Sequence, residues 1–358
     1  MQAVVLVGGE GTRLRPLTYD IPKPMLPIIE RPIIARVVEW LAFNGVTRAV
    51  LALGYRPDPF MEAFPDSAWH GVDLVYSTEP EPLDTAGAVA YAADFADMTG
   101  ERLVILNGDI LTDLELPKLL AAHEESGGSV SIALTPVEDP SPYGVVALDD
   151  NRRILEFVEK PSRETAPSNL INAGTYVFEP EALAMIERGR RVSMEREILP
   201  ELARKGAAFA LDSDAYWIDT GTPQRYVHAQ LHVIAGLRPN VILPEHEVHS
   251  PGVLVGPGAV IDGEILGNAF IGSHAIVEEG AVVENAVIGT SAKIRSGSTV
   301  RGSVLLRDVA IDPKAHVEDS VIGPACRVGE GAAISSCVIG AGFTVEEGYI
   351  LVDARRPD

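Results

Sequence analysis

The chain has 358 residues, 46% of them hydrophobic, and 29 Lys and Arg stand against 51 Asp and Glu, a formal net charge of −22. This acidity argues against nucleic acid as a partner, because phosphate backbones are bound by basic surfaces. No apolar run approaches the roughly 20 residues of a membrane span, and no signal-peptide pattern precedes the first strand. The two cysteines, Cys326 and Cys337, are too few for a disulfide framework. We therefore expect no membrane partner and a reduced, cytoplasmic protein.

The chain begins with a predicted strand that runs into a glycine-rich loop. Residues 4–7 (VVLV) are apolar and rich in β-branched side chains, and GGEGTR follows at residues 8–13. Glycines let the backbone bend sharply and present N–H groups to phosphate oxygens. Arg13 and Lys23 add positive charge at the same place. Together these features predict a polyphosphate site.

Further strands and helices alternate up to about residue 235. Residues 33–44 have helical spacing of apolar side chains and end at Gly45, a suitable helix C-cap. Strands are predicted at residues 48–53, 103–106 and 130–134. This alternation predicts a Rossmann-like α/β domain with a mostly parallel sheet, whose ligands bind at the carboxyl ends of the strands.

A different pattern replaces the helical one after about residue 250. An aliphatic residue recurs every 17 residues, and further aliphatic residues follow at steps of 6, 6 and 5. The recurring positions are Ile271, Ile288, Leu305, Ile322 and Ile339. So short a repeat predicts a solenoid whose coils have three sides and stack on one another.

These patterns divide the chain into predicted parts. We expect a catalytic domain at residues 1–235, a linker at 236–250, a β-helix at 251–348 and a frayed tail at 349–358.

The first motif carries a family resemblance. The string G-G-x-G-T-R-L-x-P-L-T, followed by P-K-P-M at residues 22–25, resembles the signature of the sugar-1-phosphate nucleotidylyltransferases. It is neither a Walker loop nor a dinucleotide fingerprint, because Leu14 stands where the third glycine of the latter would be. The resemblance implies transfer of a nucleotidyl group from a nucleoside triphosphate to a sugar 1-phosphate, with release of pyrophosphate. The solenoid resembles the left-handed parallel β-helix appended to many such enzymes.

The resemblance also implies roles for residues of the phosphate and metal sites. Arg13 would bind the leaving pyrophosphate and Lys23 the α-phosphate. Mg²⁺ would be held by Asp109, in the segment LNGD, and by Asp219, in the segment WIDTGTP. The loop residues assigned to the nucleotide are Gly8, Gly9, Gly11 and Thr12.

The base is expected at a second segment, with nucleotide-binding residues Glu79, Leu83, Thr85, Ala86 and Gly87. Asp84 departs here from the family's usual glycine. Glu79 occupies the position of a base-reading glutamine in the thymidylyl relatives. An ionised carboxylate only accepts hydrogen bonds, so Glu79 suits the adjacent N–H donors of guanine better than thymine or uracil.

The sugar phosphate is expected at Tyr143, Gly144, Glu159, Lys160, Asn172 and Gly174. Lys160 would bind the phosphate, and Glu159 and Asn172 the ring hydroxyls. The segment SMEREILP at residues 193–200 resembles the S-x-E-x-[ED]-x-x-P segment of the guanylyl branch, which acts on mannose 1-phosphate. GTP and mannose 1-phosphate are therefore the expected substrates.

Other interpretations remain open at this point. Within the family, the chain could be a glucose-1-phosphate thymidylyl-, uridylyl- or adenylyltransferase. In another class, relatives with this architecture serve as non-catalytic regulatory subunits, which tend to lose the catalytic cations. The presence of Arg13, Lys23, Asp109 and Asp219 favours the enzyme. A homo-oligomer is also expected.

Overall fold

The computed structural model describes residues 1–54, 57–238 and 240–357. Its contacts divide the chain into two compact units, the first comprising residues 1–9 and 37–217 and the second residues 10–36 and 218–358. This division differs from the predicted catalytic domain at residues 1–235, because residues 10–36 and 218–235 group with the β-helix. Residue 239 of the predicted linker and residue 358 of the predicted tail lie outside the described residues.

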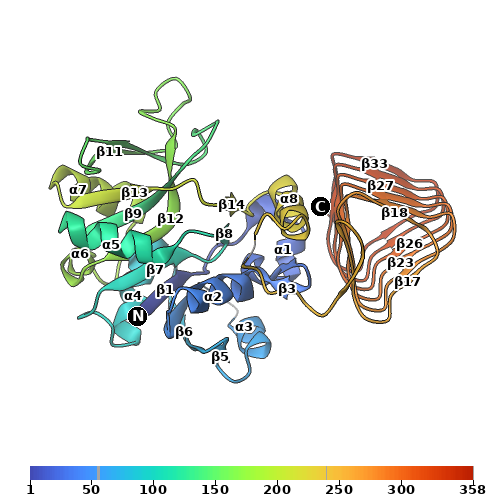
Figure 1. The fold of residues 1–358 in the computed structure, drawn as a ribbon, viewed down its shortest axis with the longest axis horizontal. Coiled ribbons are helices and arrows are strands. Elements are labelled where there is room, and N and C mark those ends of the chain that lie inside the picture. The colour runs from blue at the N-terminus through green and yellow to red at the C-terminus, as the bar shows by residue number, and fades with distance from the viewer. Residues whose placement is uncertain (55–56, 239, 358) are drawn as a thin grey trace. The chain divides into compact units, whose positions relative to one another are not determined.

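The first unit contains a 10-stranded sheet with the order β11-β10-β12-β7-β1-β4-β6-β5, to which β9 and β13 are added beside β12 (Figure 1). Its centre, β7-β1-β4-β6, is parallel, as predicted, whereas β12 runs antiparallel to β7 and β9. The strands are β1 (Gln2–Leu6), β4 (Arg48–Leu53), β5 (Ala68–Trp69), β6 (Val72–Thr78), β7 (Leu103–Asn107), β9 (Val130–Pro136), β10 (Gly144–Leu148), β11 (Ile154–Glu159), β12 (Leu170–Phe178) and β13 (Ala208–Asp212). Two short strands, β8 (Ile110–Thr112) and β14 (Trp217–Asp219), lie outside this sheet.

The helices largely follow the apolar periodicity. The helix predicted at residues 33–44 is α2 (Ile33–Phe43), and Gly45 follows it with φ 80°, a conformation that favours glycine. The others described between residues 57 and 217 are α3 (Asp58–Ala63), α4 (Asp84–Phe95), α5 (Leu116–Ser126), α6 (Pro180–Ala184), the π-helical turn η3 (Met194–Ile198) and α7 (Leu199–Arg204). None of the helices that the structure describes is long and apolar enough to cross a membrane.

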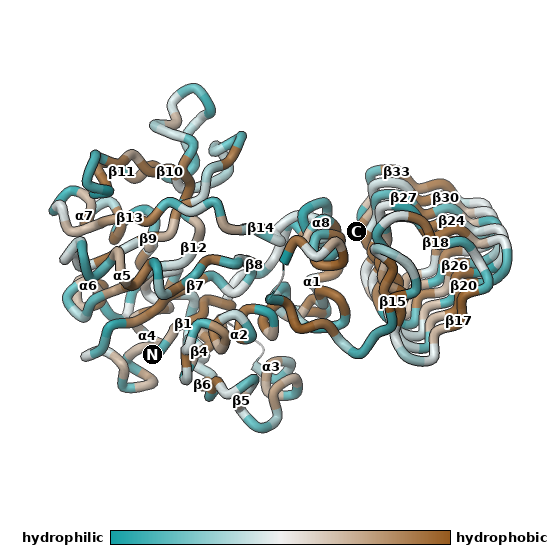
Figure 2. The backbone as a smooth tube through the Cα atoms, in the orientation of Figure 1, coloured by the Kyte–Doolittle hydropathy of each residue, from teal (hydrophilic) through white to brown (hydrophobic). Residues whose placement is uncertain are grey.

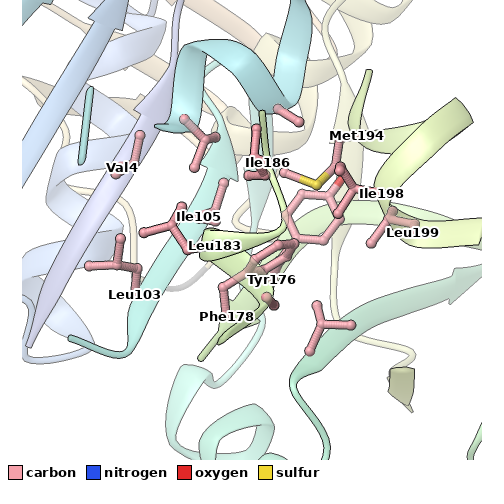
Figure 3. Packing of buried hydrophobic residues seen from close by; sticks show 14 of the residues in the cluster. Val4, Leu103, Ile105, Tyr176, Phe178, Leu183, Ile186, Met194, Ile198 and Leu199 are labelled. Atoms are coloured by element: carbon pink, nitrogen blue, oxygen red, sulfur yellow. The ribbon is translucent and has the colours of Figure 1, made fainter. Parts of the chain in front are cut away.

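The core of the first unit joins the sheet to the segment around η3. Val4 and Ile105, from the parallel centre, belong to the same buried cluster as Tyr176 from β12 and Met194 from η3 (Figure 3). All four are almost fully buried, and burial of such side chains contributes about 1.5–3 kcal/mol each. Residues that follow β1 and β7 are therefore fixed by a rigid core.

The second unit contains the predicted parallel β-helix, which is confirmed. Three sheets form the three sides of a stack of coils, with orders β15-β16-β19-β22-β25-β28-β31-β34, β17-β20-β23-β26-β29-β32 and β18-β21-β24-β27-β30-β33 (Figure 1). Equivalent residues of successive coils pair in register, as in Ile288 with Leu305 and Leu305 with Ile322. These inward aliphatic residues form one buried cluster, and in Figure 2 hydrophobic strand segments alternate with hydrophilic turns.

The strands of the β-helix are short. They are β15 (Glu247–Ser250), β16 (Val253–Val255), β17 (Val260–Ile261), β18 (Glu264–Leu266), β19 (Ala269–Ile271), β20 (Ile276–Val277), β21 (Val282–Glu284), β22 (Val287–Ile288), β23 (Lys293–Ile294), β24 (Thr299–Arg301), β25 (Val304–Leu305), β26 (Ala310–Ile311), β27 (His316–Glu318), β28 (Val321–Ile322), β29 (Arg327–Val328), β30 (Ala333–Ser335), β31 (Val338–Ile339), β32 (Thr344–Val345), β33 (Ile350–Val352) and β34 (Arg355–Arg356).

Two of the predicted boundaries are wrong. Residues 350–352 and 355–356 of the predicted tail are strands that pair with the preceding coil. Residues 247–250 of the predicted linker pair antiparallel with β16. The coils continue because the inward aliphatic position recurs once more: Leu351 pairs with Ile334 and is 6% exposed.

One outward face of the β-helix is apolar and buried. Successive side chains of a strand point to opposite faces, so the neighbours of the inward residues point outward, yet Phe270, Val304 and Val321 are 0–1% exposed. The remaining elements of the second unit are η1 (Thr12–Leu14), α1 (Leu17–Asp20), η2 (Lys23–Met25), β2 (Pro27–Ile28), β3 (Arg31–Pro32) and α8 (Pro223–Ile234). Of these, α8 contacts β19, and Pro16, just before α1, contacts Gly340 of the β-helix. This burial explains why residues 10–36 group with it.

Candidate functional site

The loop after β1 begins at a close approach of two backbones. A Cβ at Gly8 would lie 3.2 Å from the backbone nitrogen of Gly54, and one at Gly54 would lie 2.9 Å from the carbonyl oxygen of Gly8. Gly8 and Gly9 are exposed directly after a buried strand, and a Cβ at Gly9 would meet no atom within 4 Å. The start of the predicted phosphate loop is therefore accessible.

Glu79 lies beside this loop in the first unit. One of its carboxylate oxygens accepts a hydrogen bond from the Leu83 N–H at 2.7 Å, and the other would lie 3.7 Å from a Cβ at Gly8. Burial raises the pKa of Glu79; the Leu83 hydrogen bond opposes this, and the charge of Asp84 adds to it. Glu79 is thus a fixed hydrogen-bond acceptor close to the glycine loop.

Asp84 shows why the family's usual residue here is glycine. Its φ is 61°, in the left-handed region, which Asp tolerates better than most side chains. The carboxylate accepts the Thr85 N–H at 2.8 Å. The aspartate therefore keeps the backbone turn that glycine would provide.

Three of the residues predicted to bind nucleotide connect α4 to η3 and to Val192 before it. The N–H groups of Ala86 and Gly87 donate to the Val192 carbonyl oxygen at 2.9 and 3.1 Å. The Thr85 hydroxyl accepts from the Met194 N–H and donates to Glu195, each at 2.8 Å. In the structure these polar groups hold the protein together, and Leu83 is itself only 4% exposed, with its N–H donated to the partly buried Glu79.

The predicted sugar-phosphate residues lie on neighbouring strands of the first unit. Gly144 of β10 pairs with Glu159 of β11, and the Lys160 N–H donates to the Tyr143 carbonyl oxygen at 2.9 Å. The Lys160 ammonium is 3.4 Å from the Glu159 carboxylate and its side chain is 61% exposed, so it can turn to a ligand. The Tyr143 ring packs edge-on against the Trp217 ring, with 5.5 Å between the ring centroids.

A bulge in β12 joins this group to the LNGD motif. Asn172 accepts the Gly174 N–H at 2.9 Å and donates to the Tyr176 hydroxyl at 2.7 Å. Gly174 has φ 69°, and a Cβ there would lie 2.7 Å from the Asn107 side-chain nitrogen. Asp109, which is half-buried, lies two residues after Asn107, between β7 and β8.

Sequence reasoning assigned no role to Glu195, although it belongs to the SMEREILP segment. Its carboxylate accepts hydrogen bonds from the hydroxyls of Thr85 at 2.8 Å and Ser193 at 3.2 Å. Burial raises its pKa, and the charge of Glu159 adds to the rise. The glutamate in the S-x-E pattern was the available signal. Glu195 thus adds a second carboxylate near Glu159.

The second unit gathers cations around one carboxylate. Asp219 lies 3.5 Å from the Lys23 ammonium, 3.7 Å from the Arg13 guanidinium and 3.4 Å from Arg225, which sequence analysis did not identify. The Lys23 side chain is 7% exposed, Asp219 13% and Arg13 58%. Because low dielectric strengthens charge interactions, the buried Lys23–Asp219 pair is the stronger contact. Arg13 remains accessible to a ligand.

Two glycines make room for this cluster. A Cβ at Gly221 would lie 2.5 Å from Arg13 Nη2 and 2.7 Å from Asp219 Oδ1, and the Gly221 N–H donates to that oxygen at 2.8 Å. Gly11 has φ 61°, and a Cβ there would lie 2.9 Å from Lys23 Cβ. Thr12, in η1, is exposed next to it. The sequence motif thus reflects steric requirements around Lys23, Arg13 and Asp219.

The described residues contain no cluster of three or more His, Cys, Asp and Glu side chains that could hold a metal ion. Magnesium does not need one, because it is commonly bound by one or two carboxylates together with substrate phosphates and water. Asp109 and Asp219, as hard oxygen donors, fit that chemistry.

The first strand of the α/β sheet ends in an exposed glycine loop, and a lysine and an arginine lie close to one carboxylate. These features define a phosphate-handling α/β enzyme, here with an appended β-helix. Residues 2–236 match the family described as Nucleotidyl transferase, and residues 265–355 match the GMPPB C-terminal domain. The chain therefore belongs to the nucleotidyl transferase family.

Individual relatives are similar over most of the chain. The mannose-1-phosphate guanylyltransferase of Mycobacterium tuberculosis is 37% identical over 269 residues, 74% of each chain. The mannose-1-phosphate guanylyltransferase catalytic subunit beta of Drosophila melanogaster is 36% identical over 72% of this chain and 68% of its own. The crystal structure of HddC from Yersinia pseudotuberculosis complexed with GMP-PN has a TM-score of 0.56 at 29% identity, covering 64% of this chain and 97% of that one.

The environment of Glu195 predicts a pH-dependent stability. The pKa of Glu195 in the folded protein is raised above 4.5, so the folded state holds this proton more tightly than the unfolded state does. This proton stabilises the folded protein at acid pH, and the stabilisation is lost as the pH rises through the pKa of the folded state. Glu195→Gln replaces the carboxyl group by a neutral amide, so the variant does not undergo this loss of stability. The variant's free energy of unfolding relative to the wild type should therefore rise between about pH 5 and about pH 8, as measured by urea unfolding.

Glu197, on the same turn, is the matched control. The Ser193 N–H and Arg190 lower its pKa, so its contribution to stability is largely present by about pH 5 and is lost only as the pH falls further. The difference between Glu197→Gln and the wild type should not change from about pH 5 to about pH 8. Equal pH dependence of both variants would contradict the assignment to Glu195.

Proposed function

We propose that the chain transfers a guanylyl group from GTP to mannose 1-phosphate, forming GDP-mannose and pyrophosphate. The observation that carries the chemistry is the Lys23–Asp219–Arg13 cluster, in which Lys23 packs against Gly11. The relatives named mannose-1-phosphate guanylyltransferase support the choice of substrates, and so does the acceptor Glu79. The non-catalytic alternative has less support, because the cations and both aspartates are retained.

In the proposed reaction, an oxygen of the sugar phosphate attacks the α-phosphorus of GTP. A new phosphorus–oxygen bond forms, the bond from the α-phosphorus to the bridging oxygen breaks, and pyrophosphate leaves. The attacking phosphate is largely deprotonated near neutral pH, so no general base is required. The protein's task is to align the two anions and to neutralise their charge.

The residues divide this task. Lys23, held in a buried position, neutralises the α-phosphate, and the exposed Arg13 follows the departing pyrophosphate. Lys160 binds the phosphate of the sugar, while Glu159 and Asn172 bind its hydroxyls. Removal of one such positioned charge costs typically 10²–10³ in kcat.

Asp109 and Asp219 would hold Mg²⁺ together with phosphate oxygens. When bound, the metal would reduce the negative charge that opposes the attack. Asp219 has a second task, because it keeps Lys23 in place when no phosphate is bound. The buried thiols of Cys326 and Cys337 suit the reducing cytoplasm that we propose as the location. Self-association of the chain remains a prediction.

The substrate pair is tested by pyrophosphate release across a matrix of nucleoside triphosphates and hexose 1-phosphates with Mg²⁺. GTP with mannose 1-phosphate should give the highest kcat/KM. Lys23→Ala, purified in parallel, should be slower by about 10²–10³ and controls for contaminating activity. Preference for dTTP with glucose 1-phosphate would refute the substrate choice, and no turnover with any pair would favour the non-catalytic alternative.

The choice of base is tested by Glu79→Gln. If Glu79 accepts both adjacent N–H donors of guanine, the change should reduce discrimination between GTP and UTP by about 1–3 kcal/mol in kcat/KM, since glutamine offers one acceptor oxygen instead of two. Glu81→Gln, an exposed carboxylate two residues further on, should leave the preference unchanged. Undiminished guanine preference in Glu79→Gln would contradict this role.

A further inference from the structure

The last coil of the β-helix contacts the phosphate loop through Arg355. This residue begins β34, which pairs parallel with β31 so that Arg355 lies opposite Val338. Backbone hydrogen bonds anchor the strand: the Val338 N–H donates to Ala354 and the Gly340 N–H donates to Arg356. Arg355 therefore projects from an ordered strand.

The Arg355 guanidinium binds the backbone on either side of Leu14. Its Nη1 donates to the carbonyl oxygen of Arg13 at 2.8 Å and to that of Arg15 at 2.5 Å. The last carbonyl groups of a helical turn lack partners within the turn, and η1 ends at Leu14. A cationic donor makes these hydrogen bonds stronger than neutral ones.

A second contact supports the same arrangement. A Cβ at Gly340 would lie 3.3 Å from Cβ and Cγ of Pro16, so the loop rests directly on the backbone of the coil. Arg355 and Gly340 thus both contact the stretch of residues 13–16. By contrast, the Arg13 side chain is 58% exposed and 3.7 Å from Asp219. Its position depends mainly on its backbone, because its own side-chain contact is loose.

We propose that Arg355 is a positioning residue, which fixes the backbone of Arg13 so that the Arg13 guanidinium meets the leaving pyrophosphate. This inference rests on the proposed function, and it assigns the C-terminal coil a part in catalysis. Without Arg355, two carbonyl groups lose their cationic donor and η1 can shift. A displacement of about 1 Å can cost as much as 10²-fold in rate.

The role is tested in the reverse reaction, with GDP-mannose and pyrophosphate as substrates. Arg355→Ala should raise the KM for pyrophosphate about tenfold and lower kcat about 10- to 100-fold, while the KM for GDP-mannose changes little. Arg355→Lys, whose ammonium can also donate to both carbonyls, should recover most of the loss. Arg301→Ala, which removes an exposed arginine paired with Glu284 elsewhere on the β-helix, is the matched control and should behave as the wild type.

A double-mutant cycle separates positioning from general stability. If Arg355 acts through Arg13, then Arg355→Ala should have little further effect in an Arg13→Ala background. Equal effects in both backgrounds, or a normal KM for pyrophosphate in Arg355→Ala, would overturn the proposal. So would a loss that Arg355→Lys does not recover and that a lowered unfolding temperature accompanies. Absence of reverse activity in the wild type would instead refute the proposed function.

Discussion

The pairing of Lys23 with Asp219 is the interaction on which the site depends. A chain with a net charge of −22 must concentrate its cations locally to bind a triphosphate, and a nearly buried lysine is costly without a partner. Asp219 supplies the partner and is itself fixed by the Gly221 N–H. The same carboxylate lies near Arg13 and Arg225, so the positive charge of three side chains gathers around it.

The β-helix extends this constraint beyond the motifs. Its inward aliphatic residues build the solenoid, and its outward residues Phe270 and Val304 are also buried, on a side where α8 packs against β19. The 17-residue repeat therefore does more than build a rod. It supports the phosphate loop, and Arg355 adds a directed polar contact to the apolar packing.

Periodicity and motifs predicted the fold well because they are local. The helix that begins at Ile33, the strand 48–53 and the coils after Ile271 all appeared as expected. The grouping of residues 10–36 with the β-helix and the strands of the predicted tail were missed, although the aliphatic at Leu351 continued the repeat. Glu195 was missed because its partner Thr85 is 110 residues away in sequence. Arg225 was missed although its partner Asp219 is only six residues away, because the pairing depends on how the chain turns between β14 and α8. Likewise, the sequence does not show that the N–H groups of residues 86 and 87 donate to Val192.

The central claim is that the protein supplies charge and alignment for one direct displacement at the α-phosphorus, without a covalent intermediate. The stereochemical course tests this claim most directly. With GTP made chiral at the α-phosphorus by sulfur substitution, one in-line attack by the sugar phosphate inverts the configuration. We expect complete inversion in the nucleotide-sugar product. Retention would require two displacements and a nucleotidyl-enzyme intermediate, and would contradict it.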